Sequence, residues 1–332
     1  MADEDYIAWE MLYGESGEQS DDWQPPAEWI PVPEPGEYDI YILLQAYTGA
    51  YRDTGMNFDY MLAQETTGYT GYGNIHCDWG DGTEDDLNKM GYPQHTYTEE
   101  GQYLIHITAD ENTSFCRGSS TNQAHWLIFK SGTKMTFFCK EYEDNNSYYL
   151  MNTFSGRNRL KYVKINHPQG IPLLKRDQFF NNCLCLQKLE LGQIYSGDIL
   201  SYTFSNCYAL KKFPVDFDNI TSVKDYGFNY CHALRNLHMT NCVSIGRSAF
   251  GGNYGGLETV FLPNCTSIGD SAFSGCYRLK SVYAPNCTSV GSGAFASCYN
   301  LQEIVVAEDC TFGTNCFQSC YSLYPRPDGS IN

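Results

Sequence analysis

The residues most able to do chemistry in this chain are its fifteen cysteines and seven histidines. Only the pairs Cys183/Cys185 and Cys316/Cys320 are close in sequence, and neither has a second pair to complete a zinc site. A structural role for the cysteines is therefore favoured over zinc binding. One set of cysteines lies three residues before a leucine, and a second set follows a short apolar segment. The first set is Cys183, Cys207, Cys231, Cys276, Cys298 and Cys320, and the second is Cys242, Cys265, Cys287 and Cys310.

The histidines and carboxylates do not form a catalytic pattern. No Gly-x-Ser-x-Gly, His-Glu-x-x-His or Walker motif surrounds the histidines, and Glu84-Asp85-Asp86 is typical of a solvated turn. Asp78 and Asp81 are candidate calcium ligands, but two carboxylates supply fewer than the roughly six to eight oxygens that bind this ion. We predict a protein that is not an enzyme, with no catalytic residue, no metal ion and no cofactor.

A phenylalanine followed by a leucine recurs at steps of 22 to 26 residues, a period typical of leucine-rich repeats. Each leucine opens a short alternating pattern, such as LKSVYA, which predicts one strand. One strand cannot bury its apolar face alone, so stacked strands would form a continuous core and a curved parallel sheet, with the cysteines stacked as buried free thiols. The pairs are Phe154/Leu160, Phe180/Leu186, Phe204/Leu210, Phe228/Leu234, Phe250/Leu257, Phe273/Leu279, Phe295/Leu301 and Phe317/Leu323.

The repeat has a recognisable consensus, N-C-x-S-[IV]-G-x-x-A-F-x-x-C-x-x-L-x-x-V. It resembles the BspA-type, or treponemal-type, leucine-rich repeat over about residues 150 to 325. The resemblance implies an extracellular adhesion or ligand-binding surface and no catalysis.

The front half of the chain has a different pattern. YDIYILL and HTYTEEGQYLIHIT alternate like strands, and WGDGT contains an Asp-Gly turn. The combination of WGDGT with His95-Thr96-Tyr97 resembles the PKD-type Ig-like module, which implies that Trp79 and Tyr97 pack the core and that the aspartates cap turns. The predicted fold is mainly β: an N-terminal Ig-like (PKD-like) β-sandwich followed by a leucine-rich-repeat solenoid with a curved parallel sheet.

Four segments are predicted along the chain. The first is acidic and contains Pro and Trp, with no Lys or Arg before Arg52, which favours an extended arm that becomes ordered only against a partner. In the third segment HWLIFK reads as a strand that would cap the first repeat. The segments are 1–35 (arm), 36–112 (PKD-like sandwich), 113–150 (linker and cap) and 151–332 (BspA-type repeats).

The net charge of -18 argues against nucleic acid as a partner. No apolar run reaches the roughly 20 residues needed to span a membrane, so we predict no membrane insertion, and the N-terminus lacks the pattern of a signal peptide. The segment PPAEWIPVPEPGEYDIYILL before WGDGT resembles the opening of phage tail and fibre-associated proteins.

These features predict a phage virion accessory protein of the tail, fibre or capsid. It would be made in the host cytoplasm, sit on the virion surface, be anchored to a virion protein by its N-terminal arm and sandwich, and present its repeats to a host-surface glycan or protein. The alternatives are a bacterial cell-surface BspA-like adhesin and an intracellular protein-interaction scaffold. Homo-oligomerisation is left open.

The residues two and four positions after each repeat leucine are expected to face outward on the concave sheet. This face would be basic at one end and aromatic at the other, which suits an acidic glycan or a protein loop, although lysines also serve only to keep a sheet soluble. A second candidate is the row Tyr208, Tyr277, Tyr299 and Tyr321, for which packing is the alternative role. The predicted binding residues are Tyr162, Lys164, Lys188, Lys212, Asn236, His238, Phe261 and Tyr283.

Overall fold

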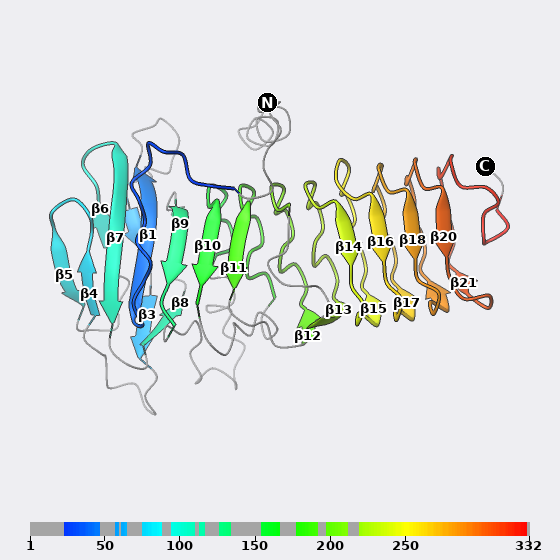
Figure 1. Ribbon diagram of the computed structural model, residues 1–332, viewed down its shortest axis with the longest axis horizontal. Helices are drawn as coiled ribbons and strands as arrows, with labels where there is room; N and C mark the ends of the chain where they lie inside the picture. Colours follow the sequence, from blue (N-terminus) through cyan, green and yellow to red (C-terminus); the bar gives the residue numbers. More distant parts are fainter. Residues whose placement is uncertain are drawn as a thin grey trace. The chain divides into compact units, whose positions relative to one another are not determined.

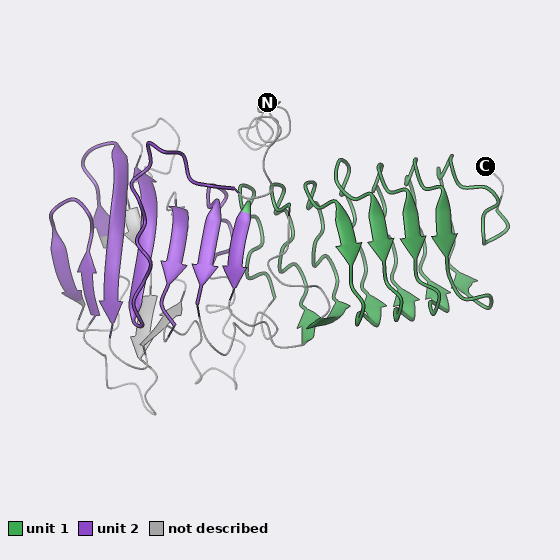
Figure 2. Ribbon diagram, in the orientation of Figure 1, with its two compact units in different colours: residues 1–21, 172–187, 194–332 green, residues 22–171, 188–193 purple. Residues whose placement is uncertain are grey.

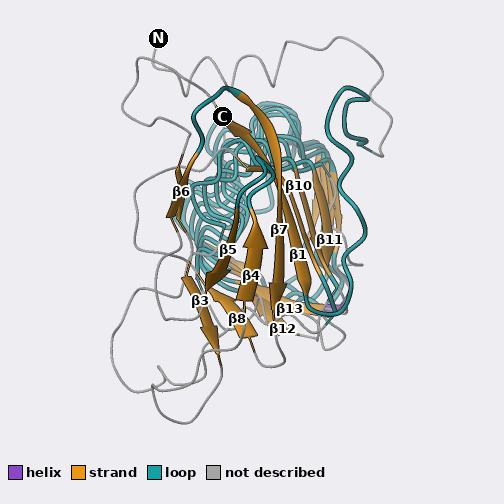
Figure 3. Cartoon of the chain, turned by 90° about the vertical axis from the view of Figure 1, so that its left-hand side faces the viewer, coloured by secondary structure: helices purple, strands orange, loops and turns teal. Residues whose placement is uncertain are grey.

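The chain forms two compact units in the computed structural model (Figure 2). The described part of the chain contains no α-helix, and loops and turns join its strands (Figure 3). Unit 1 comprises Met1–Asp21, Pro172–Gln187 and Ile194–Asn332, and unit 2 comprises Asp22–Ile171 and Lys188–Gln193. The structure describes residues 23–46, 57–59, 61–64, 75–87, 94–109, 113–116, 126–133, 154–166, 177–191, 197–211 and 219–330.

Unit 2 is built on a seven-stranded mixed sheet in the order β11-β10-β9-β1-β7-β4-β5 (Figure 1). β1 pairs antiparallel with both β7 and β9, whereas β9, β10 and β11 run parallel. Two smaller antiparallel pairs join β2 to β6 and β3 to β8. The sheet strands are β1 (Asp39–Ala46), β4 (Ile75–Asp78), β5 (Glu84–Leu87), β7 (Gly101–Ala109), β9 (Trp126–Ser131), β10 (Tyr162–Ile165) and β11 (Lys188–Leu191), and the smaller pairs contain β2 (Asn57–Asp59), β3 (Met61–Gln64), β6 (Gln94–Thr96) and β8 (Thr113–Cys116).

The large sheet continues from the predicted PKD-like segment into the repeats. β9, from the predicted capping segment, pairs with β1 on one side and with β10 on the other. β10 and β11 are the strands that follow the repeat residues Leu160 and Leu186. The mainly-β class is confirmed, whereas the two-layer sandwich and the division into four segments stay predictions.

The WGDGT turn of unit 2 is held by its own side chains. Trp79 and Tyr97 are buried, and the Tyr97 hydroxyl donates a hydrogen bond of 2.9 Å to the Trp79 carbonyl. An Asp78 carboxylate oxygen accepts from the N–H two residues later at 2.8 Å, and Asp81 accepts from the Thr83 N–H at 3.0 Å. The burial of Trp79 and Tyr97 confirms their expected place in the core, and these hydrogen bonds confirm that Asp78 and Asp81 cap turns.

Unit 1 contains two parallel sheets, one of six strands and one of four (Figure 1). The repeat pattern predicted one strand per repeat, but from β14 to β21 the strands alternate between the two sheets. The reason is that the S-[IV]-G segment also pairs with its neighbours. The six-stranded sheet contains β12 (Gly197–Ile199), β13 (Ile220–Val223), β15 (Ser244–Ile245), β17 (Ser267–Ile268), β19 (Ser289–Val290) and β21 (Thr311–Phe312), and the four-stranded sheet contains β14 (Asn236–His238), β16 (Thr259–Phe261), β18 (Ser281–Tyr283) and β20 (Glu303–Val305).

The core of unit 1 is a ladder of phenylalanine rings. Neighbouring rings lie 5.1 to 5.7 Å apart and within 12° of parallel. The backbone beside each ring also joins consecutive coils, as where the Phe273 N–H donates to the Ala294 carbonyl at 2.8 Å. The continuous core predicted from the repeat is therefore confirmed. The stacked rings are Phe180, Phe204, Phe228, Phe250, Phe273, Phe295 and Phe317.

The cysteines before the repeat leucines form a second ladder beside the rings. Five of these thiols donate hydrogen bonds of 3.0 to 3.3 Å to a phenylalanine carbonyl of the preceding coil. In the coil without such a cysteine, the Asn253 amide donates to the Phe228 carbonyl at 3.3 Å instead. Burial raises the pKa of Cys276 to about 12, so this thiol stays protonated. The predicted ladder of buried free thiols is confirmed for the described repeat cysteines, and Cys310 of the second set is partly exposed.

Candidate functional site

The predicted binding residues fall on both units, and each unit is considered separately. Unit 2 carries Tyr162, Lys164 and Lys188 on β10 and β11. Lys212 lies outside the described residues. The four remaining residues lie on the four-stranded sheet of unit 1, and they are Asn236, His238, Phe261 and Tyr283.

An aromatic row crosses the solvent-facing side of the four-stranded sheet. The parallel register places His238, Phe261 and Tyr283 opposite one another on β14, β16 and β18. The ring centroids of His238 and Phe261 are 4.7 Å apart, and those of Phe261 and Tyr283 are 5.1 Å apart, with each pair within 6° of parallel. His238 is exposed, Phe261 is partly exposed and Tyr283 is 42% exposed. The row therefore presents ring edges to solvent.

A polar row runs beside the aromatic row, one residue per strand. The Thr259 hydroxyl donates to the Asn236 amide oxygen at 2.7 Å, which links two neighbouring strands. At the start of the strands, Glu258 pairs with Lys280 at 2.8 Å and with Arg278 at 2.9 Å. The hydrogen bond from Lys280 lowers the pKa of Glu258, so this carboxylate remains charged on the surface. The polar row is Asn236, Thr259, Ser281 and Glu303.

The second candidate binding surface, the row from Tyr208 to Tyr321, contains more rings than the four predicted tyrosines. His232 and Tyr254 fill its gap, and consecutive centroids are 4.8 to 5.7 Å apart. The signal for His232 was available, since it follows Cys231 as Tyr208 follows Cys207. His232 is half-buried, whereas Tyr321 at the end of the row is 68% exposed. The row both packs the coils and faces solvent.

We expect the stability of unit 1 to fall below pH 6.5 because of His232. Its Nδ1 atom is buried and has no hydrogen-bond partner among the described residues, and burial lowers its pKa from the ordinary 6.5. The unfolded state therefore takes up a proton first as the pH falls, and the stability present above pH 6.5 is lost on the acid side. Urea midpoints measured at neutral and mildly acidic pH should show a smaller pH difference in His232→Phe than in the wild type. Equal pH differences in the two proteins would contradict this role.

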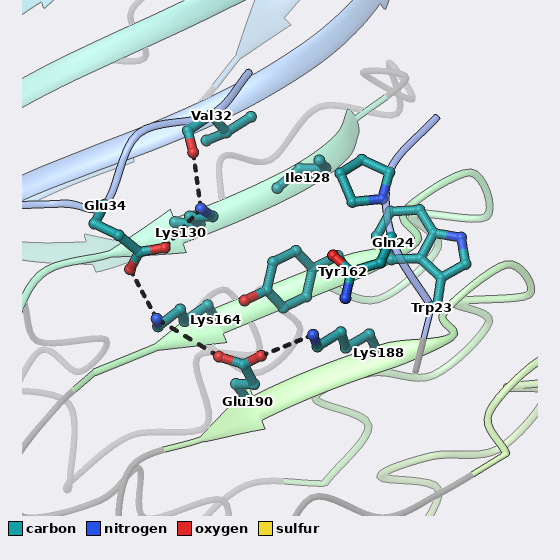
Figure 4. Close-up of a pocket in the computed structure, with 11 residues that line it drawn as sticks. Trp23, Gln24, Val32, Glu34, Ile128, Lys130, Tyr162, Lys164, Lys188 and Glu190 are labelled. Carbon is teal, nitrogen blue, oxygen red and sulfur yellow. Dashed lines mark hydrogen bonds and ion pairs between the residues drawn. The ribbon is translucent and has the colours of Figure 1, made fainter. Parts of the chain in front are cut away.

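Unit 2 has a pocket of about 280 Å³ between the segment 23–34 and strands β9 to β11 (Figure 4). Trp23, Trp29, Ile30 and Val32 pack against a buried cluster that includes Tyr162. The expectation that the arm is ordered only against a partner is therefore wrong for residues 23–35, because these apolar side chains find a sheet face within their own chain. Residues 1–22 lie outside the described residues.

Charged side chains alternate in sign along this pocket (Figure 4). Glu34 pairs with Lys130 at 2.9 Å and with Lys164 at 2.7 Å. Glu190 lies 3.6 Å from Lys164 and 3.2 Å from Lys188. Hydrogen bonds from Lys164 and then Lys130 lower the pKa of Glu34, and the bond to Glu34 raises the pKa of Lys164. Glu34 and Lys164 thus stabilise each other in their charged forms.

Tyr162 was predicted to face outward as a binding residue, but in unit 2 it is buried. Tyr162 is only 8% exposed, because Trp23 covers it at a centroid distance of 6.2 Å. The pocket also contains Trp23, Glu34 and Lys130, which were not predicted from the sequence. A signal existed for Lys130, since alternation in HWLIFKS places it on the same face as Ile128.

A comparison with protein families identifies the repeats. The profile of the BspA type leucine rich repeat region matches residues 142–253 and 197–324, which is more than half of the chain. The chain belongs to the BspA-type leucine-rich repeat family. This confirms the resemblance seen in the repeats, and the BspA-type match leaves residues 1–141 unassigned. In the described residues, no helix is long and apolar enough to cross a membrane, and no group of three or more His, Cys, Asp or Glu is placed to hold a metal ion.

The BspA-type chain is also similar to solved leucine-rich repeat structures. A leucine rich repeat protein of T. pallidum is 18% identical, with 64% of this chain and 83% of that chain covered and a TM-score of 0.38. A leucine rich cell surface protein of Faecalibacterium prausnitzii is 21% identical, with 60% and 51% covered and a TM-score of 0.44, so the chain spans about half of that protein's length. A leucine-rich repeat protein of Bacteroides ovatus is 18% identical, with 65% and 76% covered and a TM-score of 0.32. No curated protein matches the chain significantly.

Proposed function

We propose that this BspA-type protein is a bacterial cell-surface adhesin and not an enzyme, and that it binds a host-surface glycan or protein through the four-stranded sheet of unit 1. The observation that carries the proposal is the pairing of an exposed aromatic row with a polar row on one rigid face. Aromatic side chains dominate the energetics of binding surfaces, and neighbouring hydroxyl and amide groups supply directional hydrogen bonds. Membership of the BspA-type family supports a surface-binding role.

The proposal is tested with full-length protein and intact host cells. We expect the triple variant H238A/F261A/Y283A to bind cells at least tenfold more weakly than the wild type, because it removes the aromatic row without touching the buried core. The matched control removes the same number of rings from the other row. It is Y277A/Y299A/Y321A. Loss of binding in the control alone, or no cell binding by the wild type, would overturn the proposal.

A PKD-like module in unit 2 belongs to the same proposal. It is supported by the buried Trp79 and Tyr97, by the turn caps of Asp78 and Asp81, and by the stacking of His95 on Trp79 at 4.7 Å. Its task would be to attach the repeats to a larger structure, with neither nucleic acid nor the membrane interior as a partner.

A phage virion accessory role is the second candidate. It rests on the resemblance of the N-terminal segment to phage tail and fibre-associated proteins, and the comparisons lend it no support. The experiment that separates the two candidates is sedimentation of the full-length protein with phage particles and with bacterial envelopes. Association with particles alone would favour the virion role, and association with envelopes alone would favour the adhesin.

A further inference from the structure

Three cations surround one carboxylate at the start of the four-stranded sheet of unit 1. The Glu258 carboxylate accepts hydrogen bonds from the Arg278 guanidinium at 2.9 Å and from the Lys280 ammonium at 2.8 Å, one on each oxygen. Arg235, one coil earlier, donates to the Gly255 carbonyl at 2.6 Å. The hydrogen bond from Lys280 lowers the pKa of Glu258, and the nearby charges of Arg278 and Arg235 lower it further. The three cations therefore share a single carboxylate.

This cluster leaves a surplus of positive charge on the solvent-facing side of the sheet. The side chains of Arg278 and Lys280 are 51% and 52% exposed, and Arg235 is also exposed. The next carboxylate along this face is Glu303 on β20, which forms no ion pair with any residue that the structure describes. The surplus is thus confined to the coils that carry β14, β16 and β18, in a chain whose net charge is -18. A partner that complements this part of the face is acidic.

The aromatic row lies beside this cluster and offers ring edges to a partner. Both faces of Phe261 are covered, by His238 at 4.7 Å and by Tyr283 at 5.1 Å, and the strand beyond Tyr283 carries Val305 at the same position. A sugar ring stacks on an open aromatic face, which Phe261 does not provide. The edge of an aromatic ring is its positive part, so it attracts carboxylates and also accepts apolar side chains. Lys280 precedes Tyr283 by three residues, which is about 10 Å along a strand.

We propose that this face binds an extended protein segment that carries both acidic and apolar side chains. Carboxylates of the segment pair with the three cations, and its apolar side chains, about three positions further along, pack on the edges of Phe261 and Tyr283. The inference rests on the proposed adhesin function and names the partner class for the same surface, which is an acidic protein segment and not a glycan.

The test is fluorescence anisotropy of the full-length protein with three labelled peptides of equal length. The first is Gly-Ser-Glu-Glu-Gly-Leu-Phe-Ser-Gly, the second has Lys in place of both Glu residues, and the third has Ser in place of Leu and Phe. We expect the first peptide to bind at least tenfold more tightly than the second and at least threefold more tightly than the third, and less tightly as the salt concentration rises. Equal binding of the first and second peptides, or no binding of the first at millimolar concentration, would overturn the proposal.

Three variants separate the cluster from the rest of unit 1, with thermal unfolding followed for each. R278Q/K280Q should weaken binding of the acidic peptide at least tenfold. The matched control K224Q/R247Q removes the same charge beside the six-stranded sheet and should leave binding unchanged. Glu258→Gln should tighten binding at least threefold, because the cations lose the carboxylate that competes with the peptide, and an ion cluster with only a structural role would give no such gain.

A further arm decides between an acidic protein and an acidic glycan. Chondroitin sulfate that binds more tightly than the acidic peptide, and loses its binding in R278Q/K280Q, would overturn the assignment to a protein. Wild-type binding by R278Q/K280Q, or weaker binding by Glu258→Gln, would overturn the role of the cluster. Failure of cell adhesion with intact peptide binding would count only against the adhesin function, whereas cell adhesion without preference for the acidic peptide would count only against this inference.

Discussion

Replacing Phe273 by alanine is expected to lower the free energy of unfolding of unit 1 by about 3 to 5 kcal/mol. The Phe273 ring is fully buried between the rings of Phe250 and Phe295, at centroid distances of 5.3 and 5.4 Å. Its removal leaves a cavity that the neighbouring coils cannot close, because their spacing is set by backbone hydrogen bonds between coils. In a stacked repeat each coil stabilises its neighbours, so the loss also weakens both adjoining interfaces.

Urea unfolding followed by circular dichroism measures this effect, and Tyr283→Ala is the matched control. Tyr283 also stacks in a ladder, on Phe261, but it is 42% exposed, so its removal opens no buried cavity. We expect the control to cost at most about 1 kcal/mol. Equal costs for the two substitutions would show that the phenylalanine ladder is not the main source of stability in unit 1.

The repeat core could be predicted from the sequence because its determinants are local and periodic. The phenylalanine and leucine positions recur at nearly constant steps, and one coil can stack on the next only if these residues meet. The same logic predicted the thiol ladder. The sequence did not predict the second strand of the coils between β14 and β21. A two-residue strand such as β17 is too short to show an alternating pattern.

The pocket of unit 2 could not be predicted because its partners are far apart in the chain. Glu34 meets Lys164 across 130 residues, and Lys130 donates to the Val32 carbonyl across 98. Composition alone made residues 1–35 resemble an extended arm, because the segment is acidic and has no Lys or Arg, although it also contains apolar residues. The burial of those apolar residues is decided by a sheet face that a local pattern does not show. Strand alternation predicted that Lys164 and Lys188 lie near one another. It did not predict that the segment containing Trp23 covers Tyr162.

Replacing Gly291 by alanine is expected to cost about 3 kcal/mol, although the change adds a single methyl group. The Gly291 N–H donates to the Ile268 carbonyl at 2.8 Å, which draws the two coils together. A Cβ atom at position 291 would lie 2.5 Å from the backbone nitrogen of Asp270 and 2.6 Å from the carbonyl carbon of Gly269. Backbone atoms held in the coil cannot move aside as a flexible side chain can, so the coils must separate.

The glycine of the S-[IV]-G motif is thus needed for close approach of the coils. Gly255→Ala is the matched control, because a Cβ atom there meets nothing within 4 Å. We expect this control to change the free energy of unfolding by no more than about 1 kcal/mol, measured by the same urea titration. If Gly291→Ala were as mild as Gly255→Ala, the spacing between coils would be adjustable. The glycine of the repeat consensus would then need another explanation. A large loss of stability in Gly291→Ala would instead show that the glycine is required for the short distance at which stacked coils form their hydrogen bonds.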